Sequence, residues 1–172
     1  KVMHGTIKLD SDNTESYLSR FGFSINTAGH VTGAFTGHGD RFATADNHKH
    51  KLELSIFDDN AYALYLKSLK AGSLCDERMK LATVRKVLVK QPPSNAEFAI
   101  EEVFPTSSTT DYYHFVLADC SLEFYPAHPP TLDFDLHLMN GDSELPAEEA
   151  GLLSMNVFAS LLLFGGCVAG AI

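Results

Sequence analysis

Histidines are the most obvious chemical groups in this chain, and it contains eight of them. His48 and His50 are two residues apart, which would place both on one face of a strand, and His38 and Asp40 precede them. A zinc site needs three or four ligands held in place by further hydrogen bonds. Because no Cys-x-x-Cys or His-Glu-x-x-His pattern accompanies these residues, we interpret the segment as a solvated polar loop and predict no metal site.

Two pairs of adjacent acidic residues, Asp58–Asp59 and Glu101–Glu102, raise the question of acid–base catalysis. Adjacent residues on a strand point to opposite faces, so the two carboxyl groups of a pair cannot act together on one substrate. The sequence contains no nucleophile elbow, no phosphate-binding glycine loop and no dinucleotide-binding fingerprint. It therefore predicts no catalytic residue, no cofactor and no enzymatic activity.

Three cysteines are present: Cys75 and Cys120 in polar surroundings, and Cys167 within an apolar run. The first two are compatible with a disulfide in an oxidising compartment and also with two free thiols in a cytosolic fold. A bond between them would close a long loop, which in the chain-entropy description stabilises a fold by about 4 kcal/mol. Cys167 is interpreted as an unpaired apolar side chain.

The elements that position these residues are predicted to be mainly β-strands. Alternation is strictest over residues 132–139, where apolar side chains alternate with Asp133, Asp135 and His137, as in a strand with one buried face. Turn-forming residues separate about eight such segments, and this pattern predicts an antiparallel β-sandwich over residues 1–143. The other strand candidates are 2–9, 21–25, 31–35, 52–56, 81–89, 97–104 and 112–119.

Three of these segments give predictions about individual side chains. Alternation over 21–25 places Phe21, Phe23 and Ile25 on one face of a strand. The same argument directs Glu53 and Ser55 outward from the core. Helical composition over 61–69, after a capping region at 58–60, predicts a helix.

The overall composition is that of a globular domain with a short appendage. Of the 172 residues, 45% are hydrophobic and 20% are charged, and the formal net charge is −9. Such a charge excludes nucleic-acid binding, which depends on Lys and Arg facing phosphates. It also argues against docking on an anionic membrane surface.

The C-terminal segment 151–172 contains no charged residue. At 1.5 Å per residue, about 20 apolar residues cross a hydrocarbon core about 30 Å thick, so we predict a transmembrane helix here, preceded by a linker over 144–150. The helix is expected to contact membrane lipid. The small residues Gly165, Gly166 and Gly170 are predicted to let it pack closely against another helix.

Charge predicts the orientation of this helix. No Lys or Arg occurs from residue 91 to residue 172, whereas cytoplasmic flanks of membrane spans are rich in both. We therefore expect the preceding domain on the extracellular or lumenal side. The sequence begins at Lys1 rather than Met, and we expect that a signal peptide has been removed.

Several segments, in this order and spacing, resemble the GOLD-domain seven-transmembrane proteins, in particular the intimal-thickness-related-receptor branch. The closing part is the most specific, with an alternating strand, a linker rich in Ala and Glu, and an apolar helix. The segments that carry the resemblance are 1–7, 20–23, 71–75, 113–120, 132–140 and 144–172.

The resemblance implies a jelly-roll-like GOLD β-sandwich, a disulfide between Cys75 and Cys120, and six further membrane spans. It carries over no ligand and no catalytic residue. The function expected from it is an exoplasmic protein-binding module of a receptor or trafficking adaptor, with protein partners on the exoplasmic side. Two alternatives remain open: a structural subunit of an extracellular or surface assembly, and the head domain of a multi-span channel or transporter.

Overall fold

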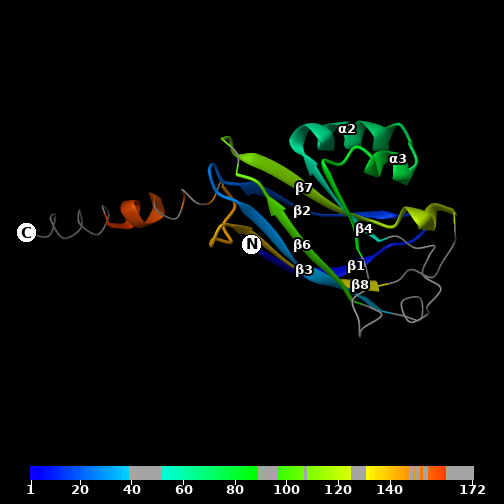
Figure 1. The fold of residues 1–172 in the computed structure, drawn as a ribbon, viewed down its shortest axis with the longest axis horizontal. Helices are drawn as coiled ribbons and strands as arrows, with labels where there is room; N and C mark the ends of the chain where they lie inside the picture. The colour runs from blue at the N-terminus through cyan, green and yellow to red at the C-terminus, as the bar shows by residue number, and fades with distance from the viewer. Residues whose placement is uncertain are drawn as a thin grey trace, which may run out of the picture.

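Two β-sheets facing one another account for most of the structure, which is a computed structural model (Figure 1). It describes residues 1–38, 52–88, 97–106, 108–124, 131–147, 149, 152 and 155–161. Both sheets are antiparallel, and each contains four strands within these residues. The predicted mainly β sandwich is therefore confirmed.

We call the two sheets A and B. Sheet A has the strand order β1 (Val2–Lys8), β8 (Thr131–Asn140), β3 (Gly29–His38) and β6 (Glu97–Phe104). Sheet B has the order β2 (Glu15–Phe23), β7 (Asp111–Ala118), β4 (Glu53–Asp58) and β5 (Val84–Val87). Each of these strands lies within or overlaps a segment predicted from alternation.

The main core lies between the sheets and is rich in phenylalanine. In β8, Leu132, Leu136 and Leu138 are buried, so the predicted one-sided strand is confirmed. Phe23 of β2 stacks on Phe104 of β6 with ring centroids 4.7 Å apart, a separation within the range that aromatic pairs favour. Aromatic packing therefore joins the two sheets at one end of the sandwich.

The predicted shared face of Phe21, Phe23 and Ile25 is only partly correct. Phe21 and Phe23 are buried, but Ile25 is 51% exposed. Strand β2 ends at Phe23, and Asn26 adopts a positive φ of 59° in the turn toward β3. Alternation applies only within a strand, so it does not fix the side of Ile25.

A helical cap covers the outer face of sheet B, above the sandwich in Figure 1. It comprises α2 (Asp59–Lys70), α3 (Cys75–Met79) and η2 (Cys120–Phe124). Helix α2 begins at the predicted place because the Asp58 side chain accepts a hydrogen bond of 2.8 Å from the backbone N–H of Ala61. A second core between the cap and sheet B includes Phe57, Tyr65 and Met79.

Glu53 and Ser55 point away from the main core as predicted, but the cap excludes them from solvent. Their exposed fractions are 8% and 0%. Two hydrogen bonds from Arg85, of 2.6 and 2.8 Å, and one from the Ser55 hydroxyl satisfy the Glu53 carboxylate. The outer face of β4 is therefore a polar layer beneath a helix and not a solvated surface.

The two edge strands on one side of the sandwich carry inward-directed charges. Lys86 of β5 pairs with Leu54 of the core, and Glu102 of β6 pairs with the buried Val31. The Lys86 ammonium and the Glu102 carboxylate form an ion pair across the gap between the sheets. Both edge strands are thereby linked by a charged pair where the apolar core ends.

Beyond the sandwich, residues 155–161 are helical, and Met155, Phe158 and Leu161 are exposed. Among the described residues, no helix combines the length and apolarity needed to cross a membrane. Most of the predicted membrane helix 151–172, including Gly165, Gly166 and Gly170, lies outside the described residues.

Candidate functional site

The outer face of sheet A is a broad surface that no described helix covers. We call it the open face and define it as the even-numbered residues of β1 and β3 with the odd-numbered residues of β6 and β8. All of these residues are exposed or half-buried, whereas their neighbours along each strand alternate with them toward the core. In Figure 1 this face lies on the side of the sandwich opposite α2 and α3.

Strand pairing assembles the open face into rows of side chains. Thr6 of β1, Asp133 of β8, Thr36 of β3 and Glu97 of β6 form one such row. The next row contains Ala34 and Ala99 at its β3 and β6 positions. Because alanine side chains are short, they project little from the middle of the open face at these two positions.

Four of the five histidines in the described residues belong to the open face. They are His4 in β1, His30 and His38 in β3, and His137 in β8. Sequence spacing had drawn attention instead to His48, His50 and Asp40, which lie outside the described residues. Only His38 of that group is described, and it faces outward at the end of β3.

Asp133 is the best-connected carboxylate on the open face. It accepts a hydrogen bond of 2.6 Å from the Thr6 hydroxyl, and its other oxygen lies 2.7 Å from Nε2 of His38. These two contacts, with that of Thr6 the stronger, lower the pKa of Asp133 below its ordinary value. Asp133 is therefore ionised at neutral pH while it organises three strands.

His137 occupies a second acidic position. Its Nε2 lies 3.6 Å from a carboxylate oxygen of Asp135, and its Nδ1 lies 3.7 Å from one of Glu144. The N-terminal ammonium of Lys1 donates to the backbone oxygens of Glu144 and Leu138, which holds the end of β1 against this corner. Both ring nitrogens of His137 thus face carboxylates.

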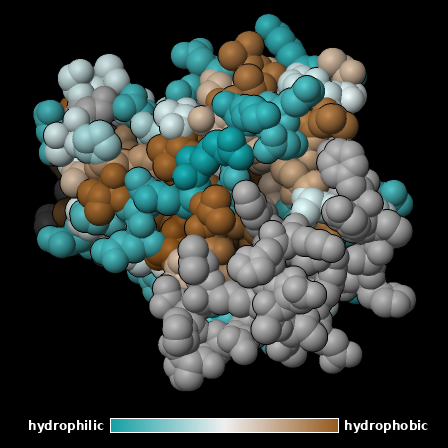
Figure 2. All heavy atoms as spheres, turned by 45° about the vertical axis from the view of Figure 1, so that its right-hand side comes forward, coloured by the Kyte–Doolittle hydropathy of each residue, from teal (hydrophilic) through white to brown (hydrophobic). Residues whose placement is uncertain are grey.

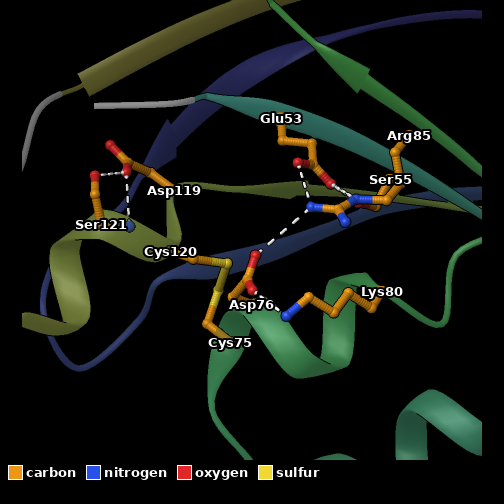
Figure 3. A network of polar contacts seen from close by, with 9 residues as sticks. All are labelled: Glu53, Ser55, Cys75, Asp76, Lys80, Arg85, Asp119, Cys120 and Ser121. Atoms are coloured by element: carbon orange, nitrogen blue, oxygen red, sulfur yellow. Dashed lines mark hydrogen bonds and ion pairs between the residues drawn. A yellow bond between two sulfur atoms is a disulfide. The ribbon is translucent and has the colours of Figure 1, made fainter. Parts of the chain in front are cut away.

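The covered face of sheet B is built differently, around a disulfide between Cys75 and Cys120 (Figure 3). The two Cα atoms are 5.2 Å apart, and the bond joins α3 to η2. This is the pairing that the family resemblance implied, and it is confirmed. Arg85 lies beside it, between the carboxylates of Glu53 and Asp76.

A second buried ion pair attaches the cap to β2. Arg78 of α3 bonds the carboxylate of Glu15, and their side chains are 10% and 8% exposed. The Tyr65 hydroxyl donates to the same carboxylate at 2.7 Å, and burial together with this contact raises the pKa of Tyr65. Each group is satisfied by the others, so this network supports the fold and offers no free nucleophile or base.

The two acidic pairs from the sequence have separate structural roles. Asp58 caps α2, whereas Asp59 contacts Nε2 of His114 at 2.9 Å. Glu101 lies on the open face, and Glu102 faces inward toward Lys86. The opposite directions predicted for adjacent residues are therefore found for Glu101 and Glu102. The strand argument does not apply to Asp58 and Asp59, because Asp59 is the first residue of α2 and both residues line the same hollow.

A polar hollow of about 320 Å³ lies between the start of α2 and the start of β7. Asp58 and Asp59 contribute carboxylates to it, together with Asp111. All three have partners in the fold, namely the α2 backbone, His114 and Thr109. Within the part of the chain that the structure describes, no three His, Cys, Asp or Glu residues are placed to hold a metal ion.

Apolar side chains are exposed on the cap, at the top of the molecule in Figure 2. Leu64, Leu66, Leu69 and Leu74 are each between 38% and 51% exposed. Hydrophilic residues interrupt them, so they form a discontinuous patch rather than a groove.

No protein-family model matches the sequence, and no curated protein is significantly similar to it. Function is therefore argued from the surfaces of this chain.

Sequence reasoning did not identify the open face as a site. The alternation of Asp133, Asp135 and His137 was visible, and so were His4 and His30. What was missing was the register, because only the pairing of β1, β8 and β3 brings these residues together.

Proposed function

We propose that residues 1–143 are the exoplasmic, protein-binding head of a GOLD-type receptor or trafficking adaptor, anchored through the apolar segment 151–172. The observation that carries the proposal is the contrast between the two sheets. Sheet B uses its outer face for a second core, whereas sheet A leaves a mostly polar face of four strands exposed among the described residues. This exposed face is available for contact with another protein, so we assign it to partner binding.

The strand order supports the fold part of the proposal. Strands run 1-8-3-6 in one sheet and 2-7-4-5 in the other. This is the order in which two Greek keys build an eight-stranded jelly roll. A jelly-roll-like GOLD domain has been expected from the resemblance, and the strand order agrees with it.

Two features support the exoplasmic location. Disulfides persist in oxidising compartments, and the Cys75–Cys120 bond lies in the stabilising second core. The absence of Lys and Arg from residue 91 onward is the charge pattern of an exoplasmic flank.

An engineered glycan tests location and binding face together. Ala34→Asn creates the acceptor Asn-Phe-Thr in the middle of the open face, and Ala71→Asn creates Asn-Gly-Ser on the cap. If the domain is exoplasmic, the native protein in cells gains a glycosidase-sensitive mass with either substitution. Only the glycan at residue 34 should remove the proximity-labelled partners of the wild-type protein.

The two glycan variants also separate the ways in which the proposal can fail. A lack of glycosylation at both residues, with the variants folded, would exclude the exoplasmic location. Glycosylation at both with equal loss, or equal retention, of labelled partners would exclude the open face as the binding surface.

The alternative of a structural subunit rests on the exposed leucines of the cap. Such a subunit would pack laterally through Leu64 and Leu69. Light scattering of the detergent-extracted native protein decides this point, because replacing both leucines with Ser would lower the mass only of a laterally packed assembly.

A further inference from the structure

The edge strands of the two sheets differ in how they are protected against the addition of a further strand. On one side of the sandwich, the inward-directed Lys86–Glu102 pair joins β5 to β6, and β5 has only four residues. On the other side, the pairing of β2 with β7 is irregular between Tyr17 and Ser19. Inward charges, short strands and bulges are the features that keep edge strands from pairing with another chain.

Strand β1 is the fourth edge strand and carries none of these features. All seven of its residues pair in continuous register with β8. Its inward-facing residues are Met3, Gly5 and Ile7, which are uncharged. The Lys1 side chain donates a hydrogen bond of 2.8 Å to the Ser19 hydroxyl, which places β1 beside β2. The side of the sandwich formed by β1 and β2 therefore includes one regular, unprotected edge.

The main core is incompletely covered beneath this edge. Gly5 is exposed at an inward-facing position, and Met3 and Phe134 are only half-buried where they pack against the core. Phe134 is the β8 partner of Gly5, and its ring would lie 3.0 Å from a Cβ atom added at Gly5. A glycine inside a strand often marks a place where another backbone approaches closely. An apolar strand added beside β1 would cover both Met3 and the Phe134 ring.

We propose that this strand is β1 of a second copy, so that two chains pair through their β1 edges in antiparallel orientation. The two four-stranded A sheets then form one continuous sheet across a two-fold axis. In the register that engages the whole of β1, Gly5 lies opposite Gly5 of the second copy. Met3 then lies opposite Ile7, and His4 lies opposite Thr6.

The side chains of β1 complement themselves in this register. Inward residues meet apolar inward residues, and the Phe134 rings of the two copies flank the central pair of glycines. No two like charges face each other across the seam, which would oppose pairing. A strand that offers an uncharged edge thus also has the alternation that such an edge requires in its partner.

Charge favours the same register. Lys8 is the only Lys or Arg among the open-face residues defined above, and it lies opposite Val2 of the second copy. Val2 is paired in turn with His137, which lies beside the carboxylates of Asp135 and Glu144. Each copy therefore directs its one basic open-face residue toward an acidic corner of the other.

The seam is short, and this determines how the dimer behaves. Its seven residues, at about 3.4 Å each, extend over about 24 Å. One pair of strands buries less surface than a standard protein interface, so the dimer should dissociate on dilution. Both open faces lie on the same side of the joined sheet. The consequence for binding rests on the proposed function: a partner with two sites is bound more tightly than by one copy.

Light scattering of the full 172-residue chain in detergent, with the detergent contribution subtracted, measures the pairing. We expect the mass to rise with concentration toward about twice the 18.8 kDa of one chain. Met3→Lys places a charge on the inner side of β1 and should keep the mass at that of one chain. Val84→Lys places the same charge at a half-buried position of β5, on the opposite side of the sandwich, and should leave the dimer intact. Circular dichroism checks that both variants are folded.

Disulfide cross-linking locates the seam without introducing a charge. In the double variant H4C/T6C, each new thiol faces one of the second copy at a Cβ separation of about 5 Å, so mild oxidation should give a covalent dimer. T32C/A34C has the same spacing on the same face of the central strand β3 and should remain uncross-linked. Both variants retain Cys167, so a link through that residue would appear equally in both.

Several results would overturn the inference. They are the mass of one chain at every concentration, a dimer that Met3→Lys leaves intact or that Val84→Lys disrupts equally, and equal cross-linking of the two cysteine variants. A dimer lost in L64S/L69S but retained in Met3→Lys would assign the contact to the cap and overturn it as well. The glycan experiment reports location and partner contact whatever the oligomeric state, so a failure of the pairing is distinguishable from a failure of the proposed function.

Discussion

The two outer faces of the sandwich differ in burial: the helical cap covers the outer face of sheet B, whereas the outer face of sheet A is exposed. On sheet B, β4 and β7 are largely buried on both sides, beneath a helical cap that a disulfide and the ion pairs Arg78–Glu15 and Arg85–Asp76 connect to the rest of the domain. On sheet A, β3 and β8 are buried on one side only, and the other side carries histidines and carboxylates. The first face forms part of a second core, and the second is exposed to solvent.

Breaking the buried ion pair between the cap and β2 should lower the free energy of unfolding more than any other substitution considered for the two faces. Replacing Arg78 with Met leaves the Glu15 carboxylate buried with Tyr65 alone, and removal of one partner of a buried pair costs about 3–5 kcal/mol. Urea unfolding of the two proteins measures the change. Lys80→Met, at an exposed pair with Asp76, is the control and should change the free energy of unfolding by less than about 0.5 kcal/mol.

Removing the disulfide should have the next largest effect. The C75A/C120A variant frees the chain between α3 and η2, and we expect the free energy of unfolding to fall by about 2–4 kcal/mol. Differential scanning calorimetry of the variant and the oxidised wild type measures the loss. Equal stability of the two proteins would mean that packing alone holds the cap on sheet B.

Removing the N-cap side chain of α2, in the first turn of the helical cap, should lower the free energy of unfolding less than removing the disulfide. Asp58 accepts hydrogen bonds from the Ala61 backbone and from Thr83, and these contacts lower its pKa below 3.8, the first being the stronger. Asp58→Ala should lower stability by about 1 kcal/mol at neutral pH. Because the pKa is lower in the folded state, the charge-dependent part is complete above the unfolded value and is lost as pH falls through the folded value.

The conservative variant isolates that charge-dependent part. Asp58→Asn retains a capping oxygen but no charge, so its difference from wild type should shrink between about pH 5 and about pH 2. Urea unfolding at several pH values within that window measures it. A difference that stays constant with pH would contradict a role for the carboxylate charge.

Substitutions on the open face should have the smallest effect on stability. Thr32→Ser and His137→Gln alter exposed or half-buried side chains outside both cores, so each should change the free energy of unfolding by less than about 0.5 kcal/mol. Thermal unfolding of each variant checks this. A loss as large as that of Asp58→Ala would show that the open face, like the covered face, is needed for the fold.

Local sequence patterns predicted the strands because alternation is a property of each strand alone. Residues 97–104 were predicted within the limits of β6, and 132–139 lie within β8. Capping chemistry likewise predicted a capping region over 58–60, and the N-cap of α2 is Asp58. Both signals depend on neighbouring residues, so one sequence is sufficient to detect them.

The covered and open faces depended on contacts between distant residues and were not predicted. Nothing near Glu53 and Ser55 indicates that α3, more than 20 residues later, will exclude them from water. Nor does the spacing of His4 and Asp135 indicate that they pair. Long-range packing and register decide which strand faces meet solvent, and they leave little trace in a local pattern.

The Lys86–Glu102 pair also disfavours association between copies of the molecule through the β5 and β6 edges of their sheets. Among the described strands, β5 and β6 lie at the edges of their sheets, and an edge strand is a template on which another chain can add a strand. A partner extending either sheet would have to continue the core past two charged groups that are already paired within one molecule. The pair would therefore disfavour the addition of a strand from a second copy at the β5 and β6 edges of the sandwich.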